Sequence, residues 1–233
     1  MNAFFLLFAL VMPSNENLVI NGDFELGNQD FTTEYEFVDD GNGPPGTGRY
    51  GVTTNPSFWH PQFDNISDHS DQNGMMMVVN SSTVQNQIVW EQTINVDRNS
   101  SYKIALCAAN ISPNPVVTVF CNSNPLFVAD LNPGASWVTT SAIWESTAND
   151  QLIMTIENAS TMSSANDFTL DNISVRLFLL GDVNLDCQLD LLDVNSFVEL
   201  IVKGGFSLEA DINNDGMVNL GDVAGFVALL TGG

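Results

Sequence analysis

The stretch from Asp182 to Asp222 contains one pattern twice, and it says more about the fold than any other part of the chain. The first copy reads DVNLDCQLDLLD, and the second reads DINNDGMVNLGD, twenty-nine residues later. In both copies, side chains that carry oxygen occupy positions 1, 3, 5, 9 and 12. These residues are Asp182, Asn184, Asp186, Asp190 and Asp193 in the first copy, and Asp211, Asn213, Asp215, Asn219 and Asp222 in the second.

This spacing is that of the twelve-residue EF-hand loop, which surrounds Ca²⁺ with about six to eight oxygen ligands. Position 7 contributes only its main-chain carbonyl, so Gln188 and Met217 are both acceptable there. Position 8 is apolar in both copies, as Leu189 and Val218, which suits a contact between paired loops. The pattern therefore predicts two calcium ions. The alternative is two acidic surface turns that precede ordinary helices.

Each loop is followed by apolar residues at helical spacing, which predicts an amphipathic helix after each loop. The residues are Val194, Phe197, Val198 and Ile201 after the first loop, and Val223, Phe226, Val227 and Leu230 after the second. Glycine pairs at 204–205 and 232–233 are expected to end the two helices, because glycine adopts the left-handed conformation that stops a helix.

The segments GDVNLDCQLDLLDVNSFVELI and ADINNDGMVNLGDVAGFVALL resemble the duplicated calcium-binding segments of type I dockerin domains. The twelfth loop residue is Asp, no entering helix is readable before the first loop, and a phenylalanine follows four residues after the last ligand in both copies. The resemblance implies a small all-α domain over residues 180–233 and a cohesin-like protein partner. Cys187 departs from the pattern, because glycine normally makes the sharp turn at position 6. A positive φ there costs a non-glycine residue about 1 kcal/mol.

In the resembling family, loop positions 10 and 11 largely determine the partner. Here these positions are Leu191 and Leu192 in the first copy, and Leu220 and Gly221 in the second. Exposed leucines are unfavourable unless they are covered. We therefore expect these residues either to pack between the two copies or to form the contact patch for the partner.

The overall charge of the protein restricts its partners. The formal net charge of the 233 residues is −23, from 28 acidic and 5 basic residues. Such a surface repels nucleic acids and anionic membranes, so both are excluded as partners. The hydrophobic content of 44% argues for a folded core rather than disorder. An acidic surface of this kind is compatible with a calcium-rich extracellular setting.

The N-terminus begins with a ten-residue apolar run from Ala3 to Met12, followed by Pro13 and Ser14. The run is too short to span a bilayer, which needs about 20 residues, but it fits the apolar part of a secretory signal peptide. We predict that residues 1–14 are such a segment and that the protein is secreted. The usual positive charge before the run is missing, which we interpret as a start that is given too late or a truncated segment. A hydrophobic first strand is the alternative.

Residues 15–179 read as an all-β domain. About nine short runs rich in β-branched and aromatic residues are separated by turn residues, which favours a two-sheet sandwich of the jelly-roll kind. The runs are NLVIN, GMMMVVN, QIVWEQTINV, SYKIALCAA, VVTVFCN, LFVADL, SWVTTSAIWES, QLIMTIEN and DFTLDNISVRLF. Between Asp30 and Asn73 the chain reads as irregular, and we expect binding residues there because loops on a rigid sandwich often bind ligands.

The opening NLVINGDFELG and the closing NDFTLDNISVRL, with MMMVVN and VWEQTINV between them, resemble jelly-roll carbohydrate-binding modules and related galactose-binding-like domains. In that group the first and last strands often share a structural calcium ion. The resemblance implies a third calcium site at Asp23, Glu25 and Asp171. From the residues alone, solvated acids at the ends of strands are an equal alternative.

Sugars stack on exposed aromatic rings, and the aromatic residues of the irregular region are the candidates for such contacts. These are Tyr50, Phe58 and Trp59, with His60 beside them. The three tryptophans at 90, 137 and 144 lie in predicted strands and are expected in the core. Structural packing is the alternative for Trp59 as well. The two histidines, His60 and His69, lack metal-ligand spacing and are predicted to be loop residues.

Cys107 and Cys121 flank the turn-rich segment NISPNP, so a hairpin would place them opposite each other. A secreted protein lies in an oxidising compartment, and we expect the two to form a disulfide, with two buried thiols as the alternative. Cys187 would then be unpaired.

Three functions remain open after the motifs are considered. No Ser-centred nucleophile elbow, zinc-protease motif, phosphate-binding loop or dinucleotide fingerprint is present in the sequence. The first hypothesis is a secreted, non-catalytic protein with a carbohydrate-binding-like sandwich and a calcium-dependent docking domain. The second is a structural protein of the cell surface or matrix with a calcium-stabilised tail. The third is a small enzyme acting on polysaccharides.

Overall fold

The computed structural model describes residues 16–39, 46–69, 73–112, 115–129, 131, 135–160 and 166–232. The chain forms two compact units, Asn17–Arg176 and Leu177–Gly233, each of which is described by itself. The segment predicted as a signal peptide lies outside the described residues. Among the described residues, no helix combines the length and apolar character needed to cross a membrane.

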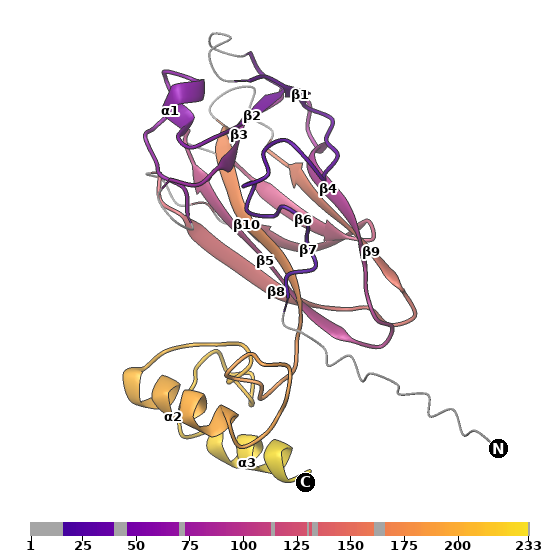
Figure 1. Ribbon diagram of the computed structural model, residues 1–233, viewed down its shortest axis with the longest axis vertical. Helices are drawn as coiled ribbons and strands as arrows, with labels where there is room; N and C mark the ends of the chain where they lie inside the picture. The colour runs from indigo at the N-terminus through magenta and orange to yellow at the C-terminus, as the bar shows by residue number, and fades with distance from the viewer. Residues whose placement is uncertain are drawn as a thin grey trace, which may run out of the picture. The chain divides into compact units, whose positions relative to one another are not determined.

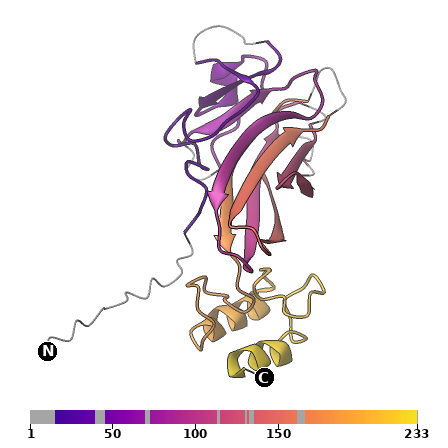
Figure 2. The ribbon, with the colours of Figure 1, turned by 90° about the vertical axis from the view of Figure 1, so that its right-hand side faces the viewer.

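The first unit is mainly β and contains two sheets, as predicted (Figure 1). The six-stranded sheet has the order β1 (Glu36–Phe37), β2 (Arg49–Thr53), β3 (Met76–Asn80), β10 (Phe168–Leu177), β5 (Ser101–Asn110) and β8 (Val138–Glu145). The four-stranded sheet has the order β4 (Gln87–Asn95), β9 (Gln151–Asn158), β6 (Val117–Cys121) and β7 (Asn124–Ala129). Strands β1 and β2 pair in parallel, whereas β4 and β9 run antiparallel side by side (Figure 2).

The core of the sandwich is formed by the inward-facing side chains of strands in which buried and exposed residues alternate. In β9 the side chains of Leu152, Met154 and Ile156 are fully buried, whereas Ile153 between them is exposed. Side chains that alternate in this way point to opposite faces of a sheet, so each strand contributes one apolar row to the core. The largest fully buried residues from both sheets are Met76, Met77, Trp90, Ile104, Leu106, Leu152, Met154, Ile156, Phe168, Leu170 and Ile173.

A second apolar cluster surrounds the one-turn helix α1 (Pro56–Trp59). Asn55 caps this helix by accepting a hydrogen bond from the Ser57 N–H at 3.0 Å. The cluster consists of Trp59, Phe63, Ile66, Met76, Val78, Ala109 and Ile111. The segment that contains α1 therefore packs on apolar residues of β3 and the end of β5.

The sequence-based strand assignment was wrong at the start of the domain. NLVIN forms no strand and leads into turns, in which Asn21 and the following Phe24 have positive φ angles. The region predicted to be irregular contains β1, β2 and α1, and Arg49–Thr53 pairs with β3 over its whole length. The sequence did not indicate strand β2, because the surrounding Gly and Pro residues dominate the local pattern. Its pairing partner, β3, lies more than twenty residues away in the chain.

The predicted disulfide between Cys107 and Cys121 is absent, and both residues are free, buried thiols. The reason is that the chain between them crosses from one sheet to the other and does not form a hairpin. Cys107 lies in β5, where its Sγ contacts Thr139 Oγ1 at 3.2 Å, whereas Cys121 ends β6. Packed sheets stand about 10 Å apart, which exceeds the Cα separation that a disulfide allows.

We therefore expect three free thiols in the protein. Burial raises the pKa of Cys107, and it raises the pKa of Cys121 to about 12, so both thiols should react slowly in the folded state. Alkylation after unfolding without a reductant should add three alkyl groups, as counted by mass spectrometry. A species with only one alkylated cysteine would contradict the two-sheet placement.

The second unit contains two helices, each preceded by one of the duplicated loops. Helix α2 spans Asp193–Lys203 and ends at Gly204, and helix α3 spans Val223–Thr231 and ends at Gly232. Both glycines are left-handed, with φ angles of 68° and 69°, so the predicted helix ends are confirmed. Between β10 and α2, the described chain contains no helix entering the first loop.

Two phenylalanines hold this unit together. The rings of Phe197 and Phe226 stack with centroids 4.0 Å apart and planes at 17°, and both residues are buried. They occupy the same position in the two copies. Val218 from the second loop is buried with them, and Leu189 from the first loop packs against the same cluster. Both apolar loop residues therefore contact the same core, whereas a direct contact between the two loops stays a prediction.

Candidate functional site

The two duplicated loops have the same internal hydrogen bonds. At position 1, Asp182 Oδ1 accepts from the Asp186 N–H at 3.0 Å and Oδ2 accepts from the Cys187 N–H at 2.9 Å. In the second loop, the two oxygens of Asp211 accept from the N–H groups of Asp215 and Gly216 at the same distances. Each loop therefore wraps around its first carboxylate.

The carboxylate at position 12 closes each loop from the other end. Asp193 Oδ1 accepts from the Val183 N–H at 2.8 Å, and Oδ2 accepts from the Asp190 N–H at 2.9 Å. Asp193 Oδ1 also accepts from the Asn184 N–H at 3.1 Å, and Asp222 makes the equivalent bonds with the N–H groups of Asn213 and Asn219, at 3.1 and 2.9 Å. Residues that are nine or ten positions apart in sequence are thus held in one ring.

Four carboxylates of these loops are buried: Asp182, Asp193, Asp211 and Asp222. None of them takes part in the ion pairs that the structure shows for the described residues. Burial also raises the pKa of Asp182. Burying negative charge without a cation is unfavourable, so the loops have the electrostatic character of a cation site.

The donor set of each loop suits a hard cation such as Ca²⁺, because it consists of carboxylate, carboxamide and main-chain oxygens. Within the described part of the chain, however, no three Asp, Glu, His or Cys side chains are gathered closely enough to hold a metal ion as they stand. In both loops the amide nitrogen of position 3, Asn184 or Asn213, donates to the carboxylate at position 5. Ion binding would require these amides to present oxygen instead.

Cys187 has a φ of 63°, and Gly216 has a φ of 83° at the same loop position. The positive φ predicted for Cys187 is therefore confirmed. Because its side chain is strained in this conformation, the first loop is the less favourable of the two.

The predicted docking residues are exposed. The side chains of Leu191 and Leu220 are each 78% exposed, and Leu192 is 64% exposed. Beside them, α2 and α3 form an open groove of about 330 Å³ whose lining is entirely apolar. It is lined by Val194, Phe197, Val198, Ile201, Val202, Leu220, Val223, Phe226, Val227 and Leu230. Val198 and Val202 of α2 and Val227 of α3 thus remain exposed within this unit.

The sandwich contains a group of acids around the predicted third calcium site. Glu25 and Asp171 were predicted for that site, and both lie near Asp68, which the sequence did not indicate. A methyl group on Gly74 would lie 2.3 Å from Glu25 Oε1 and 2.8 Å from Asp68 Oδ2, so both carboxylates converge on this glycine. Asp68 is also hydrogen-bonded to Asp171. The contacts of the described residues do not bring Asp23 into this group; its side chain accepts from the Glu25 N–H.

Asp171 is the fully buried member of this acidic group. Burial, together with the hydrogen bond and the negative charge of Asp68, raises the pKa of Asp171 to about 8. The N–H groups of His69 and Asn172 donate to its two oxygens, at 3.1 and 2.7 Å. Asp68 escaped the sequence-based prediction because it lies in the middle of the chain, far from both terminal strands.

The aromatic residues predicted to contact sugars are mostly in the core. Trp59 is only 3% exposed, and its Nε1 donates to Val38 O at 2.7 Å. Tyr50 is also buried, and its hydroxyl donates to Asn28 Oδ1. Neither ring presents a face to solvent, so neither is suited to stack on a sugar. Only Phe58, at 68% exposure, remains as an aromatic candidate from that set.

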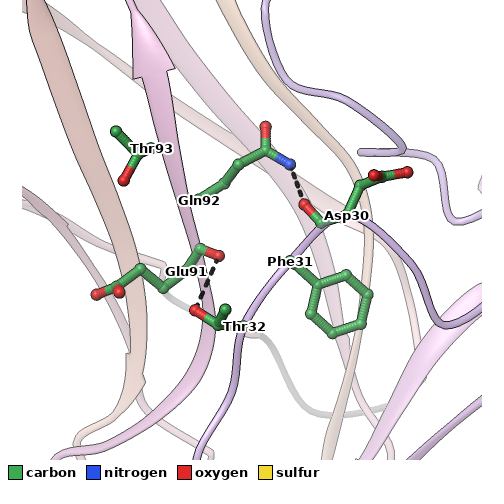
Figure 3. Close-up of a pocket in the computed structure, with 6 residues that line it drawn as sticks. All are labelled: Asp30, Phe31, Thr32, Glu91, Gln92 and Thr93. Atoms are coloured by element: carbon green, nitrogen blue, oxygen red, sulfur yellow. Dashed lines mark hydrogen bonds between the residues drawn. The ribbon is translucent and has the colours of Figure 1, made fainter.

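Two open hollows lie elsewhere on the sandwich. The first has a volume of about 410 Å³ and is lined by Asp30, Phe31, Thr32, Glu91, Gln92 and Thr93 (Figure 3). The second has a volume of about 390 Å³ and is lined by Asn122, Ser123, Asn149, Asp150, Gln151 and Ile153. Asp30, Phe31 and Thr32 begin the region in which binding residues were expected, although none of them was named as a candidate. The sequence did not indicate the other lining residues, which belong to ordinary polar turns and to strands.

No protein-family model and no curated protein matches this chain. Among solved structures, a cyclase from Fischerella sp. TAU is similar over 70% of this chain and 96% of its own, with 15% identity and a TM-score of 0.48. The carbohydrate-binding module TmCBM61, solved with beta-1,4-galactotriose, is similar over 70% and 99%, with 11% identity and a TM-score of 0.47. The tandem CBM22 domain of Paenibacillus barcinonensis Xyn10C is similar over 72% and 47%, with 16% identity and a TM-score of 0.46. Similarity at this level carries no conclusion about function.

Proposed function

We propose that this is a secreted, non-catalytic binding protein whose sandwich binds a polysaccharide and whose C-terminal unit attaches it to a protein partner in the presence of calcium. The observation that carries the proposal is the repeated loop: two copies with the same hydrogen bonds, each burying two carboxylates, are followed by helices with an uncovered apolar face. A simple surface turn would explain neither the burial of charge nor its repetition.

In this proposal two calcium ions are bound by the twelve-residue loops. The side chains of positions 1, 3, 5, 9 and 12 and the main-chain carbonyls of Gln188 and Met217 would hold them. The ions neutralise the buried carboxylates and thereby hold the two helices in place. The third ion expected at Asp23, Glu25 and Asp171 of the sandwich stays a prediction, because the described acidic side chains are not gathered closely enough to hold a metal ion as they stand.

The partner is proposed to be a cohesin-like domain, which would cover the apolar surface of α2 and α3. Exposed Leu191, Leu192 and Leu220 border or line this surface. Because the groove has no polar lining, we expect hydrophobic contact to dominate the affinity. Binding should therefore weaken by only about threefold or less when the salt concentration rises from low to moderate values.

Charged residues on this surface should prevent attachment. We expect the double variant Leu191→Asp with Leu192→Asp, or the single variant Leu220→Asp, to bind at least one immobilised type I cohesin domain about 100-fold more weakly than the wild-type protein. That loss corresponds to about 2.7 kcal/mol, the order expected when one or two leucines are no longer buried in the complex. Surface plasmon resonance of the calcium-loaded, full-length protein against a panel of cohesin domains measures it.

The matched control is Asn195→Asp, which adds charge to an exposed position of α2 outside the groove. It should bind as the wild-type protein does. Calcium affinity should be unchanged in all variants, as isothermal titration calorimetry would establish. Binding that survives chelation, or that is unaffected by every one of the leucine variants, would refute the docking proposal.

A further inference from the structure

The two hollows of the sandwich adjoin each other on one face of the four-stranded sheet. Thr93 lines the first hollow and Ile153 lines the second, and these two residues are direct partners in the antiparallel pairing of β4 with β9. Side chains of such partners lie about 5 Å apart on the same face. Both are exposed, whereas their neighbours Ile94 and Leu152 are buried in the core. The two hollows are therefore neighbours across the paired strands, and together they are called the groove.

The ends of this groove are fixed by hydrogen bonds to the same two strands. On one side, the N–H and C=O of Thr32 exchange 2.9 Å hydrogen bonds with Glu91 of β4. On the other side, the Asn122 N–H donates to Ile153 O, and the Ile153 N–H donates to Asn122 Oδ1 at 2.8 Å. The groove thus spans three strand spacings, or about 14 Å, which matches a short stretch of a linear sugar chain.

The groove combines an apolar floor with uncommitted polar groups. The side chain of Ile153 is 44% exposed at its centre, and Phe31 is half-buried at one end. The hydroxyls of Thr93 and Ser123 make no hydrogen bond with the other described residues, so they are available to a ligand. A sugar ring has the complementary character, because it presents an apolar C–H face and a rim of hydroxyl groups.

The wall of the groove is held rigidly before any ligand binds. Gln92 Nε2 donates to the main-chain carbonyls of Ile20 and Asp30, and its Oε1 accepts from the Ile20 N–H at 3.0 Å (Figure 3 shows the bond to Asp30). Thr155 Oγ1 donates to Glu91 Oε2 at 3.1 Å. A site whose side chains are already ordered loses less entropy when it binds a ligand.

The negative charge of the groove favours neutral ligands over acidic ones. Asp30, Glu91 and Asp150 line it, and no basic side chain is among the described lining residues. Arg98 approaches from outside and pairs with Asp150. Together with the net charge of −23, these carboxylates would repel uronates and sulfated sugars. Carboxylates do, however, accept hydrogen bonds from neutral sugar hydroxyls.

We propose that this groove, running from Asp30–Thr32 across Thr93 and Ile153 to Asn122–Ser123, is the binding site for a neutral, linear polysaccharide. The inference rests on the proposed carbohydrate-binding function and assigns it to a site on the four-stranded sheet. It moves the expected sugar contacts away from the aromatic residues of the α1 region.

The full-length protein tests this by affinity electrophoresis in gels that contain one polysaccharide each. The neutral probes are xylan, galactan, xyloglucan, mannan and hydroxyethyl cellulose, and the acidic probes are alginate and polygalacturonate. We expect retardation by at least one neutral probe and by neither acidic probe. Ile153→Glu, which removes the apolar floor and adds charge, should weaken the interaction at least tenfold. Thr93→Val, which removes one hydroxyl from a strand position that accepts valine, should weaken it about fivefold.

The control is Ile143→Glu, the same substitution at a half-buried position of β8 in the other sheet, which should bind as the wild-type protein does. Thermal unfolding of each variant shows whether a loss of affinity comes from a loss of folding. Thr93→Val is a variant that keeps the shape of the strand.

The outcomes separate the groove from the carbohydrate function. If the wild-type protein binds a neutral probe and both groove variants bind equally well, the groove is not the site, although the carbohydrate function stands. If no neutral probe binds, the carbohydrate function itself fails. Preferential binding of an acidic probe would overturn the ligand class.

Discussion

Removal of calcium from the full-length protein is expected to abolish the helical circular dichroism of the C-terminal unit. Between Asp182 and Asp222 the chain carries nine carboxylates and one lysine, and four of these carboxylates are buried. Without a cation, their mutual repulsion and their desolvation oppose folding of a unit whose core consists mainly of two stacked phenylalanines and the residues around them. We therefore expect α2 and α3 to depend on the bound ions.

The size of this effect follows from linkage. For a site with a dissociation constant of about 10 μM at about 1 mM calcium, binding stabilises the folded unit by roughly 2.7 kcal/mol, and two sites approach the total stability of a small domain. The measurement is far-ultraviolet circular dichroism in excess EDTA, followed by readdition of calcium. The strand signal of the sandwich should persist, because its core contains the many buried residues of two sheets. A helical signal that does not change in EDTA would contradict the prediction.

The second large effect is expected from Phe226→Ala. Phe226 is buried and stacks on Phe197, so its removal leaves a cavity between the two helices. Substitutions of this kind cost about 3–5 kcal/mol, which is comparable with the whole stability of a unit of this size. We expect the C-terminal unit of this variant to be largely unfolded even in saturating calcium, while the sandwich unfolds at its normal temperature.

Differential scanning calorimetry of the calcium-loaded variant measures both units in one experiment. Val227→Ala is the matched control, since it shortens the neighbouring side chain, which is half-exposed in the groove. That control should lose less than about 1 kcal/mol. If Phe226→Ala keeps a C-terminal transition within a few degrees of the wild-type protein, the stacked phenylalanines are not the core of the unit.

The features that could be predicted from the sequence are those encoded over a single turn or loop. The spacing of acids from Asp182 to Asp193 specifies a loop because the ligands are only two to four residues apart. The positive φ of Cys187 followed from its position in that loop, and the helix ends followed from Gly204 and Gly232. Alternation identified most strands of the sandwich for the same reason, since it is visible within five to ten residues.

The features that could not be predicted from the sequence depend on pairing between strands that are far apart in the chain. Arg49–Thr53 became a strand only through its register with β3, and Trp59 became a core residue only because the segment around it folds onto the six-stranded sheet. Cys107 and Cys121 were separated by a crossover between sheets, and Asp68 reached Asp171 across about one hundred residues. The groove at Thr93 and Ile153 likewise exists only because β4 pairs with β9. Local propensity contains no information on which distant strands will pair, because that choice depends on the packing of the whole core.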